Sequence, residues 1–92
     1  MARCPKSKSE AFKRLDRKFS TEEKKQIMNA DAYELHFTLG MWIRNYWIYS
    51  GEKENIESLL VDLGKEPLFY LPDIVSSDII EAYQLYLREK SI

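Results

Sequence analysis

Two side chains near the middle of the chain could take part in acid–base or anion-binding chemistry. His36 is the only histidine, and histidine ordinarily titrates near neutral pH. A catalytic histidine needs an activated nucleophile or an orienting carboxylate beside it. Glu34 is close in sequence but would lie on another side of a helix. We therefore expect His36 to hold a backbone carbonyl or a carboxylate, and we predict no catalytic residue, no metal site and no cofactor.

Arg44 follows eight residues after His36, in an otherwise apolar stretch. A buried arginine is costly unless it is paired. Its candidate partners are Asp62, Glu66 and Asp73, or the carboxylate of a ligand. We expect an internal ion pair with one of these residues that fastens the last helix. A small-ligand or enzymatic site formed by His36 and Arg44 is the alternative.

Both side chains lie between Asp31 and Gly51, a stretch that predicts one helix over about residues 32–49. Asp31 is a good N-cap, and Gly51 is a plausible stop after the last turn. Apolar side chains fall on most sides of this helix, which is typical of a helix buried at the centre of a bundle. Its charged residues argue against a membrane span. Gly40 in mid-helix indicates close approach of another backbone.

Aromatic side chains crowd the end of the predicted helix, where Trp42, Tyr46, Trp47 and Tyr49 follow one another. Such residues are mostly core, but Trp and Tyr also anchor protein interfaces. The alternative to core packing is that a bundle of this size leaves some of them for a partner or a second copy of the chain. The candidate binding residues are His36, Arg44, Asn45, Trp47 and Tyr49, and the candidate structural residues are Gly40, Trp42, Arg44 and Asp73.

The run His36-Phe37-Thr38-Leu39-Gly40-Met41-Trp42-Ile43-Arg44-Asn45 resembles the signature of a family of small bacterial proteins with a domain of unknown function. The pattern is HF-x-LGMWIRN, followed by an aromatic tail and a Pro-Asp step that opens a last helix, here Pro72-Asp73. The resemblance departs at Leu71, where the family has a histidine. It implies a compact helical fold and a bacterial cytosolic origin, and it implies no activity.

Four further helices are predicted around the central one, because apolar side chains recur at helical spacing between capping residues. They run from Ser7 or Ser9 to about Lys18, from Ser20 to Asn29, from Glu54 to Leu63, and from Asp73 towards the end. Pro67 and Pro72 disfavour helix over residues 65–71, whose apolar side chains we expect to cover the central helix. The fold class is therefore all-α, a compact bundle of about five helices.

The amino-acid composition is typical of a small globular protein. The 92 residues are 45% hydrophobic, which is enough for one domain with a real core. We expect a flexible N-terminal arm over residues 1–8 and a single helical domain over residues 9–92. The one cysteine, Cys4, excludes an internal disulfide and suits a reducing compartment. Without an apolar segment after Met1 that could act as a signal peptide, we expect a cytoplasmic protein.

Charge is unevenly distributed along the chain. Residues 1–25 hold nine Lys or Arg and four Asp or Glu, whereas residues 26–92 hold five and eleven. The basic segment 3–25 could bind nucleic acid, or it could attract the acidic remainder of the fold. The corner at residues 29–31 has the spacing of a helix-turn-helix, but its second helix is too apolar to read bases.

The sequence therefore predicts a non-enzymatic protein-interaction or regulatory module of the bacterial cytoplasm. Its expected partner is another protein or a second copy, and we expect no membrane partner. Nucleic-acid binding through residues 3–25, or a ligand site at His36 and Arg44, are the alternatives.

Overall fold

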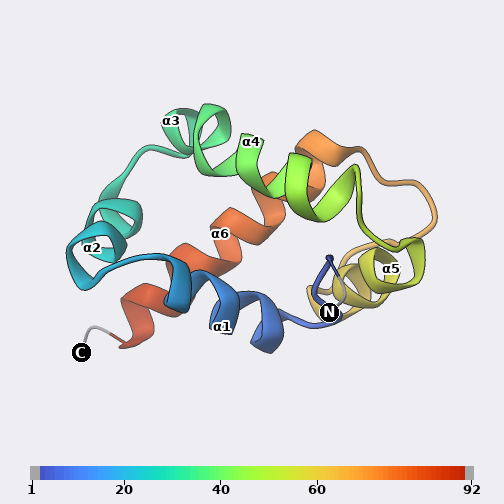
Figure 1. The fold of residues 1–92 in the computed structure, drawn as a ribbon, viewed down its shortest axis with the longest axis horizontal. Coiled ribbons are helices and arrows are strands. Elements are labelled where there is room, and N and C mark those ends of the chain that lie inside the picture. The colour runs from blue at the N-terminus through green and yellow to red at the C-terminus, as the bar shows by residue number, and fades with distance from the viewer. Residues whose placement is uncertain (1–2, 91–92) are drawn as a thin grey trace.

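The longest helix, α6 (Pro72–Lys90), lies in the middle of the molecule and packs against most of the others (Figure 1). The computed structural model describes residues 3–90. Over these residues the chain is helical with no strand, so the all-α prediction is confirmed. The helices that contact α6 are α1 (Lys8–Lys18), α2 (Thr21–Asn29), α3 (Ala32–Phe37), α4 (Leu39–Ile43) and the π-helix η1 (Arg44–Ile48); α5 (Lys53–Asp62) follows them.

The predicted helix over residues 32–49 is divided into α3, α4 and η1. The break is at Thr38, whose backbone N–H closes a tight turn onto the carbonyl of Leu35 at 3.2 Å. Its hydroxyl donates to the carbonyl of Glu34, also at 3.2 Å. A threonine that bonds back to the preceding turn competes with regular helix, which accounts for the break. Taken together, α3, α4 and η1 form one helical segment, and the described residues then hold five.

Burial differs from the prediction on the outer side of this segment. Leu35, Leu39 and Ile43 are buried against the core, but Phe37 and Met41 are about half exposed. A helical pattern does not distinguish an apolar residue in the core from one left on the outside. The helix enclosed by neighbours is instead α6, which buries residues such as Ile79, Ile80 and Tyr83 among the surrounding helices.

The capping residues behave largely as the sequence predicts. The side chain of Ser7 accepts from Glu10 at the start of α1, and that of Asp31 accepts from Tyr33 at the start of α3. Ser20 and Glu23 form a complete capping box on α2. Gly64 ends α5 with a φ of 75°, a conformation that favours glycine. Gly51, the plausible stop of the central helix, has no positive φ, so it follows η1 without a left-handed conformation.

Arg3 and Cys4, in the segment expected to be a flexible arm, contact the turn before α5. Cys4 is fully buried, and the carboxylate of Glu52 accepts from the backbone N–H groups of Arg3 and Cys4 at 3.3 and 3.2 Å. The N–H of Lys8 donates to Asp62 at 2.7 Å. Burial and the nearby Glu52 carboxylate raise the pKa of the Cys4 thiol to about 12. Residues 1 and 2 lie outside the described part of the chain.

The connector, residues 65–71, does not cover the central segment as expected. Only Tyr70 among its large apolar residues packs against the core, while Leu68, Phe69 and Leu71 are exposed. Pro67 and Pro72 keep this stretch out of helix, and its backbone turns these side chains outward. Among residues 3–90, none of the helices combines the length and apolar composition that a membrane crossing requires.

Candidate functional site

Arg44 joins η1 to the start of α6 through a set of polar contacts. Its side chain is buried, and its guanidinium donates to the backbone carbonyl of His36 at 3.0 Å and to the hydroxyl of Ser76 at 2.9 Å. Its Nε lies 3.5 Å from a carboxylate oxygen of Asp73. The expected pairing of Arg44 with an acidic residue near the last helix is therefore present. Asp73 itself is 69% exposed, so the charge pair is at the surface end of the cluster.

Because Gly40 has no side chain, it leaves space for the guanidinium of Arg44. A Cβ atom at residue 40 would lie 3.0 Å from Nη1 of Arg44 and 3.5 Å from Cδ1 of Ile80. The close approach inferred from a mid-helix glycine thus involves side chains from η1 and α6 and also the backbone, because the carbonyl oxygen of Leu35 in α3 would lie 3.3 Å from that Cβ atom. Ser76 is the member of the cluster that the sequence did not reveal, since a serine at a helical position gives no sign of burial.

His36 is half buried, and its ring is occupied by neighbours. Nδ1 lies 3.4 Å from Nη1 of Arg44, and the ring meets Phe37 edge-on at 5.0 Å. The hydroxyl of Ser76, which belongs to this cluster, has no exposed surface and donates to the carbonyl of Asp73 at 3.0 Å. Arg44 and Ser76 are therefore engaged within the fold, and the cluster fastens α6 to the segment from α3 to η1.

The other candidate binding residues do not share one surface. Asn45 and Tyr49 are exposed, whereas Trp47 is buried and meets Trp42 edge-on at 5.4 Å. Trp42 is half buried, and the ammonium group of Lys18 lies 4.3 Å from its ring centre. Trp42 thus lies at the surface beside the end of α1.

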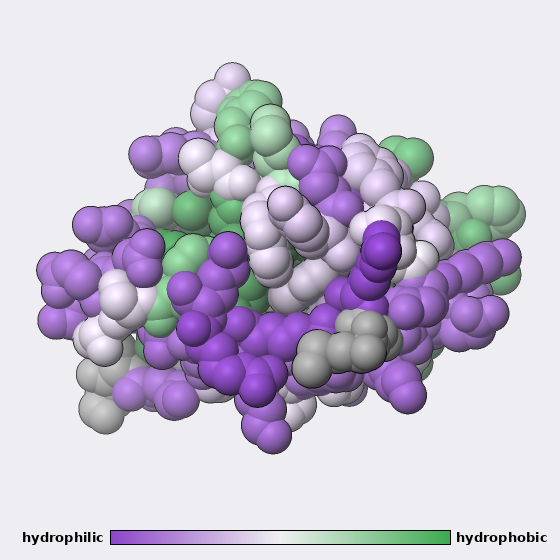
Figure 2. All heavy atoms as spheres, viewed as in Figure 1, coloured by the Kyte–Doolittle hydropathy of each residue, from purple (hydrophilic) through white to green (hydrophobic). Residues whose placement is uncertain are grey.

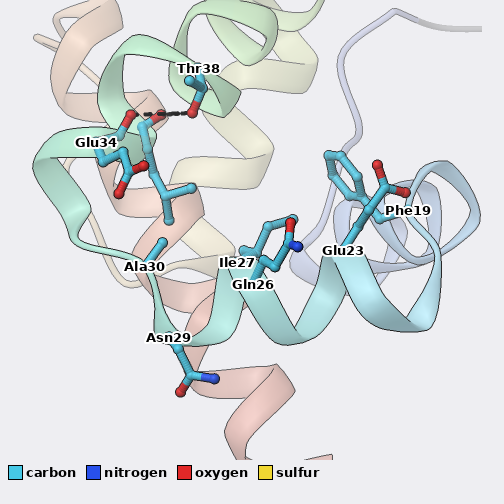
Figure 3. A pocket seen from close by; sticks show the side chains of 9 residues that line it. Phe19, Glu23, Gln26, Ile27, Asn29, Ala30, Glu34 and Thr38 are labelled. Carbon is cyan, nitrogen blue, oxygen red and sulfur yellow. Dashed lines mark hydrogen bonds between the residues drawn. The ribbon is translucent and has the colours of Figure 1, made fainter.

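A groove opens where α2 and α3 diverge. Gln84 of α6 donates to the carbonyls of Ile27 and Ala30 at 3.0 and 3.1 Å, which holds the corner between the two helices. The space beyond this corner is a hollow of about 450 Å³. Glu34 and Thr38 border it on the α3 side, and α2 borders it on the other (Figure 3).

A second hollow of about 300 Å³ continues the first along α4. The two share lining residues, so they form one groove with an apolar floor. Figure 2 shows hydrophobic atoms at the surface between α2 and α4, with hydrophilic atoms around them. Glu34 lies at the α3 end, whereas Glu23 lies beside Phe19 (Figure 3) and near Lys18, which borders the second hollow. We define the α2–α3 groove by Phe19, Ile27, Leu35, Thr38, Leu39 and Trp42.

The sequence did not predict this groove. Apolar side chains at helical spacing predict packing against a core, which Ile27, Leu35 and Leu39 do, but the pattern gives no sign of a hollow above them. The groove depends on the angle at the α2–α3 corner, which Gln84 sets from more than fifty residues away. The one sequence signal was the surplus of large apolar residues over what a chain of 92 residues can enclose.

A separate polar cluster ties α1 to α6. The carboxylate of Asp16 accepts from the hydroxyls of Tyr83 and Tyr86 at 2.8 and 2.6 Å, and Lys24 and Lys90 lie near it. Burial opposes ionisation of Asp16, but the hydrogen bonds from Tyr86 and Tyr83 outweigh it. The pKa of Asp16 therefore lies below its ordinary value, and that of Tyr83 lies above its own because of burial and the bond to Asp16.

We expect Asp16→Asn to remove about 1–2 kcal/mol from the free energy of unfolding at pH 7. Because the pKa of Asp16 is lowered by folding, its stabilising effect is complete above about pH 5 and is lost as pH falls through the folded-state pKa. Melting temperatures between about pH 3 and pH 7 should show wild type and variant converging at the acid end. A gap of constant size would contradict this assignment. Asp78→Asn, which removes a carboxylate that lies 3.8 Å from Lys65, is the comparison for loss of an ion pair alone.

The basic segment 3–25 is partly used within the fold. Arg14 pairs with Glu10 at 2.7 Å and donates to the carbonyl of Arg3, and Lys24 lies 3.7 Å from Asp16. Hydrophilic atoms cover the lower part of the view in Figure 2, where α1 lies in Figure 1. The attraction between the basic start and the rest of the fold is thus present, alongside exposed lysines of α1 and α2.

No curated protein and no solved structure matches the chain significantly. One family model does match, over residues 4–87, which is nearly the whole chain and includes the groove, the Arg44 cluster and the connector. This confirms the resemblance inferred from the run at residues 36–45. The chain therefore belongs to the family described as "Domain of unknown function (DUF6794)".

Proposed function

We propose that this protein is a non-enzymatic protein-interaction module of the bacterial cytoplasm, and that the α2–α3 groove receives an apolar segment of a partner polypeptide. The observation that carries the proposal is the groove itself: two joined hollows with a floor of large apolar side chains, open to solvent on a chain of 92 residues. Concave hollows with mostly apolar linings are where proteins typically bind their ligands and partners.

The shape and chemistry of the groove favour a polypeptide occupant. Ile27, Leu35 and Leu39 supply a floor that is continuous with the core. Phe19 and Trp42 are partly buried at its borders, so an apolar side chain inserted between them would complete their burial. Large aromatic residues in such positions contribute most of the binding free energy in many interfaces. The elongated form, with charges at both ends, suits a segment that lies along it.

A non-enzymatic role is favoured by how the polar groups are used. The groups that could have served catalysis, His36, Arg44 and Ser76, contact one another and hold α6 in place. Arg44 is buried, so a ligand carboxylate would have to displace these contacts to reach it. The proposal therefore assigns the Arg44 cluster to the fold and the groove to function.

Selection of peptides from a displayed random library, with the intact chain as bait, tests the proposal. Thr38 is exposed and borders both hollows, so Thr38→Arg places a long charged side chain in the groove. We expect selected peptides to carry at least two large apolar residues and to lose about tenfold or more in affinity for Thr38→Arg. Affinity is read from the fluorescence anisotropy of the labelled peptide.

Ser58→Arg is the matched control, because Ser58 is an exposed small polar residue on α5, outside the groove. Peptides should bind this variant as they bind wild type. Gln26→Arg, on the opposite wall, repeats the test in case Thr38→Arg lowers the melting temperature. Selected peptides that bind both groove variants as tightly as wild type, or a library that yields no binder, would overturn the proposal.

A further inference from the structure

A third hollow, of about 320 Å³, lies outside the α2–α3 groove. We call it the lysine hollow, and its lining residues come from the end of α1, one face of α2 and the end of α6: Asp16, Thr21, Lys24, Lys25, Met28, Leu87 and Lys90. Positions 21, 24, 25 and 28 recur at helical spacing, so they share one face of α2. The residues of α2 that border the groove, Glu23, Gln26 and Ile27, lie on another face. The lysine hollow is therefore a separate site.

We infer that the lysine hollow binds a small organic anion, whose charged head lies among the three ammonium groups and whose apolar body covers Met28 and Leu87. The inference does not rest on the proposed function of the groove. It follows from the charge of the lining residues, from the hydrogen-bond donors that they keep, and from the apolar floor between them.

Positive charge exceeds negative charge in the hollow. Lys24, Lys25 and Lys90 supply three ammonium groups, and Asp16 supplies the one carboxylate of the described lining, which leaves an excess of two positive charges. Nζ of Lys24 lies 3.7 Å from one oxygen of Asp16, and Nζ of Lys90 lies 3.8 Å from the other. The two ammonium groups therefore face the same small space. Like charges held in this way repel, and an anion between them would relieve the repulsion.

The ammonium groups also keep donors for a ligand. The oxygens of Asp16 already accept from two tyrosine hydroxyls at 2.8 and 2.6 Å, and its distances to Lys24 and Lys90 are too long for hydrogen bonds. Lys90 donates to the hydroxyl of Tyr86 at 3.0 Å, which uses one of its three donors. Lys25 is exposed and forms no ion pair with another residue of 3–90. Each lysine can therefore donate to an anionic head.

The floor of the hollow determines the rest of the ligand. Leu87 belongs to the core, and Met28 packs against the core while it stays partly exposed. Methionine adapts its shape to apolar groups of many kinds. An inorganic ion would leave this floor uncovered, so the ligand that fits combines an anionic head with an apolar chain or ring. A volume of about 320 Å³ is near the lower end of the usual range for small-ligand sites, which favours a small molecule.

Methyl NMR of the intact chain, with methionine, leucine and isoleucine methyl groups labelled, tests the inference with sodium octanoate as the probe. Octanoate should bind saturably with a dissociation constant below about 1 mM. The largest shift changes should occur at Met28 and Leu87. Acetate keeps the charged head but lacks the chain, and octan-1-ol keeps the chain but lacks the charge. Each should bind about tenfold more weakly, or worse.

A double variant, Lys25→Gln with Lys90→Gln, removes two of the three ammonium groups at exposed positions. It should raise the dissociation constant for octanoate about fivefold or more. The matched control, Lys13→Gln with Lys53→Gln, removes the same charge from exposed positions of α1 and α5 outside the hollow. This control should bind octanoate as wild type does, and equal melting temperatures of the two double variants should show that neither has lost its fold.

Three results with octanoate would overturn the inference. They are the largest shift changes at Ile27, Leu35 and Leu39 in the groove, equal affinity of the two double variants, and acetate binding as tightly as octanoate. An anionic head on an apolar chain also occurs in membrane lipids. Sedimentation of the protein with phosphatidylglycerol vesicles, without any shift from octanoate, would replace the small anion with a lipid surface and would also overturn the inference.

Discussion

Arg44→Ala is expected to lower the free energy of unfolding by about 3 kcal/mol. The substitution removes charge-assisted hydrogen bonds to the His36 carbonyl and the Ser76 hydroxyl, and it leaves Ser76 with no exposed surface and without its donor. Hydrogen bonds to charged groups contribute about 1.5–3 kcal/mol each. Urea denaturation followed by circular dichroism measures the change. A urea unfolding curve indistinguishable from that of wild type would contradict the role of Arg44 in fastening α6 to η1.

Asp73→Asn tests the ion pair of this cluster separately from the hydrogen bonds that Arg44 donates to His36 and Ser76. The carboxylate of Asp73 is mostly exposed and lies 3.5 Å from Arg44, so its charge pair should contribute less than about 1 kcal/mol. We therefore expect Asp73→Asn to be mild where Arg44→Ala is severe. Equal losses in the two variants would mean that the ion pair, and not the hydrogen bonds to His36 and Ser76, holds α6.

Gly51→Ala is expected to destabilise the fold by a similar amount, about 3 kcal/mol. A Cβ atom at residue 51 would overlap the carbonyl oxygen of Trp47 and would come within 2.8 Å of Cβ of Cys4. Both neighbours are buried, so the backbone after η1 or the packed start of the chain would have to move. The melting temperature, followed by circular dichroism, reports the loss.

Gly64→Ala is the matched comparison for this prediction. Gly64 has a φ of 75°, but a Cβ atom there would meet nothing within 4 Å. Its replacement should cost only the backbone term of about 1–2 kcal/mol. If Gly51→Ala is as stable as Gly64→Ala, the segment that holds Cys4 can move aside at little cost. That result would contradict the tight packing of Cys4 against residue 51.

The sequence predicted what depends on neighbouring residues. The starts of α1, α2 and α3 follow from Ser7, Ser20 and Asp31, whose side chains bond to amides two or three positions away. The pairing of Arg44 with an acidic residue of the later chain was also predicted, because a charge in an apolar stretch demands a partner. In each of these cases one residue type carries a local physical requirement.

What the sequence did not predict depends on residues that are far apart. Tyr83 and Tyr86 looked like ordinary core residues until the fold placed Asp16 against their hydroxyls. The packing of Cys4 against the turn before α5 requires Glu52 to cap the backbone at the start of the chain. The prediction that the connector covers the central segment was wrong for a further reason. Apolar side chains are buried only where the fold still has room for them.

The same reasoning applies to the functional surface. Asn45, Trp47 and Tyr49 were chosen by type, and the fold separates Trp47 in the core from the exposed Tyr49. The groove has core residues, Ile27, Leu35 and Leu39, as its floor, and it opens because α2 and α3 diverge at the corner at Ala30. No single-residue pattern encodes an opening of this kind.

The central claim is that the α2–α3 groove is the binding surface, and methyl NMR of the intact chain tests it most directly. With isoleucine and leucine methyl groups labelled, the tightest selected peptide is added in steps. The account predicts the largest shift changes at Ile27, Leu35 and Leu39, which form the floor of the groove. The largest changes at Leu59 and Leu60, on the buried face of α5, would contradict it.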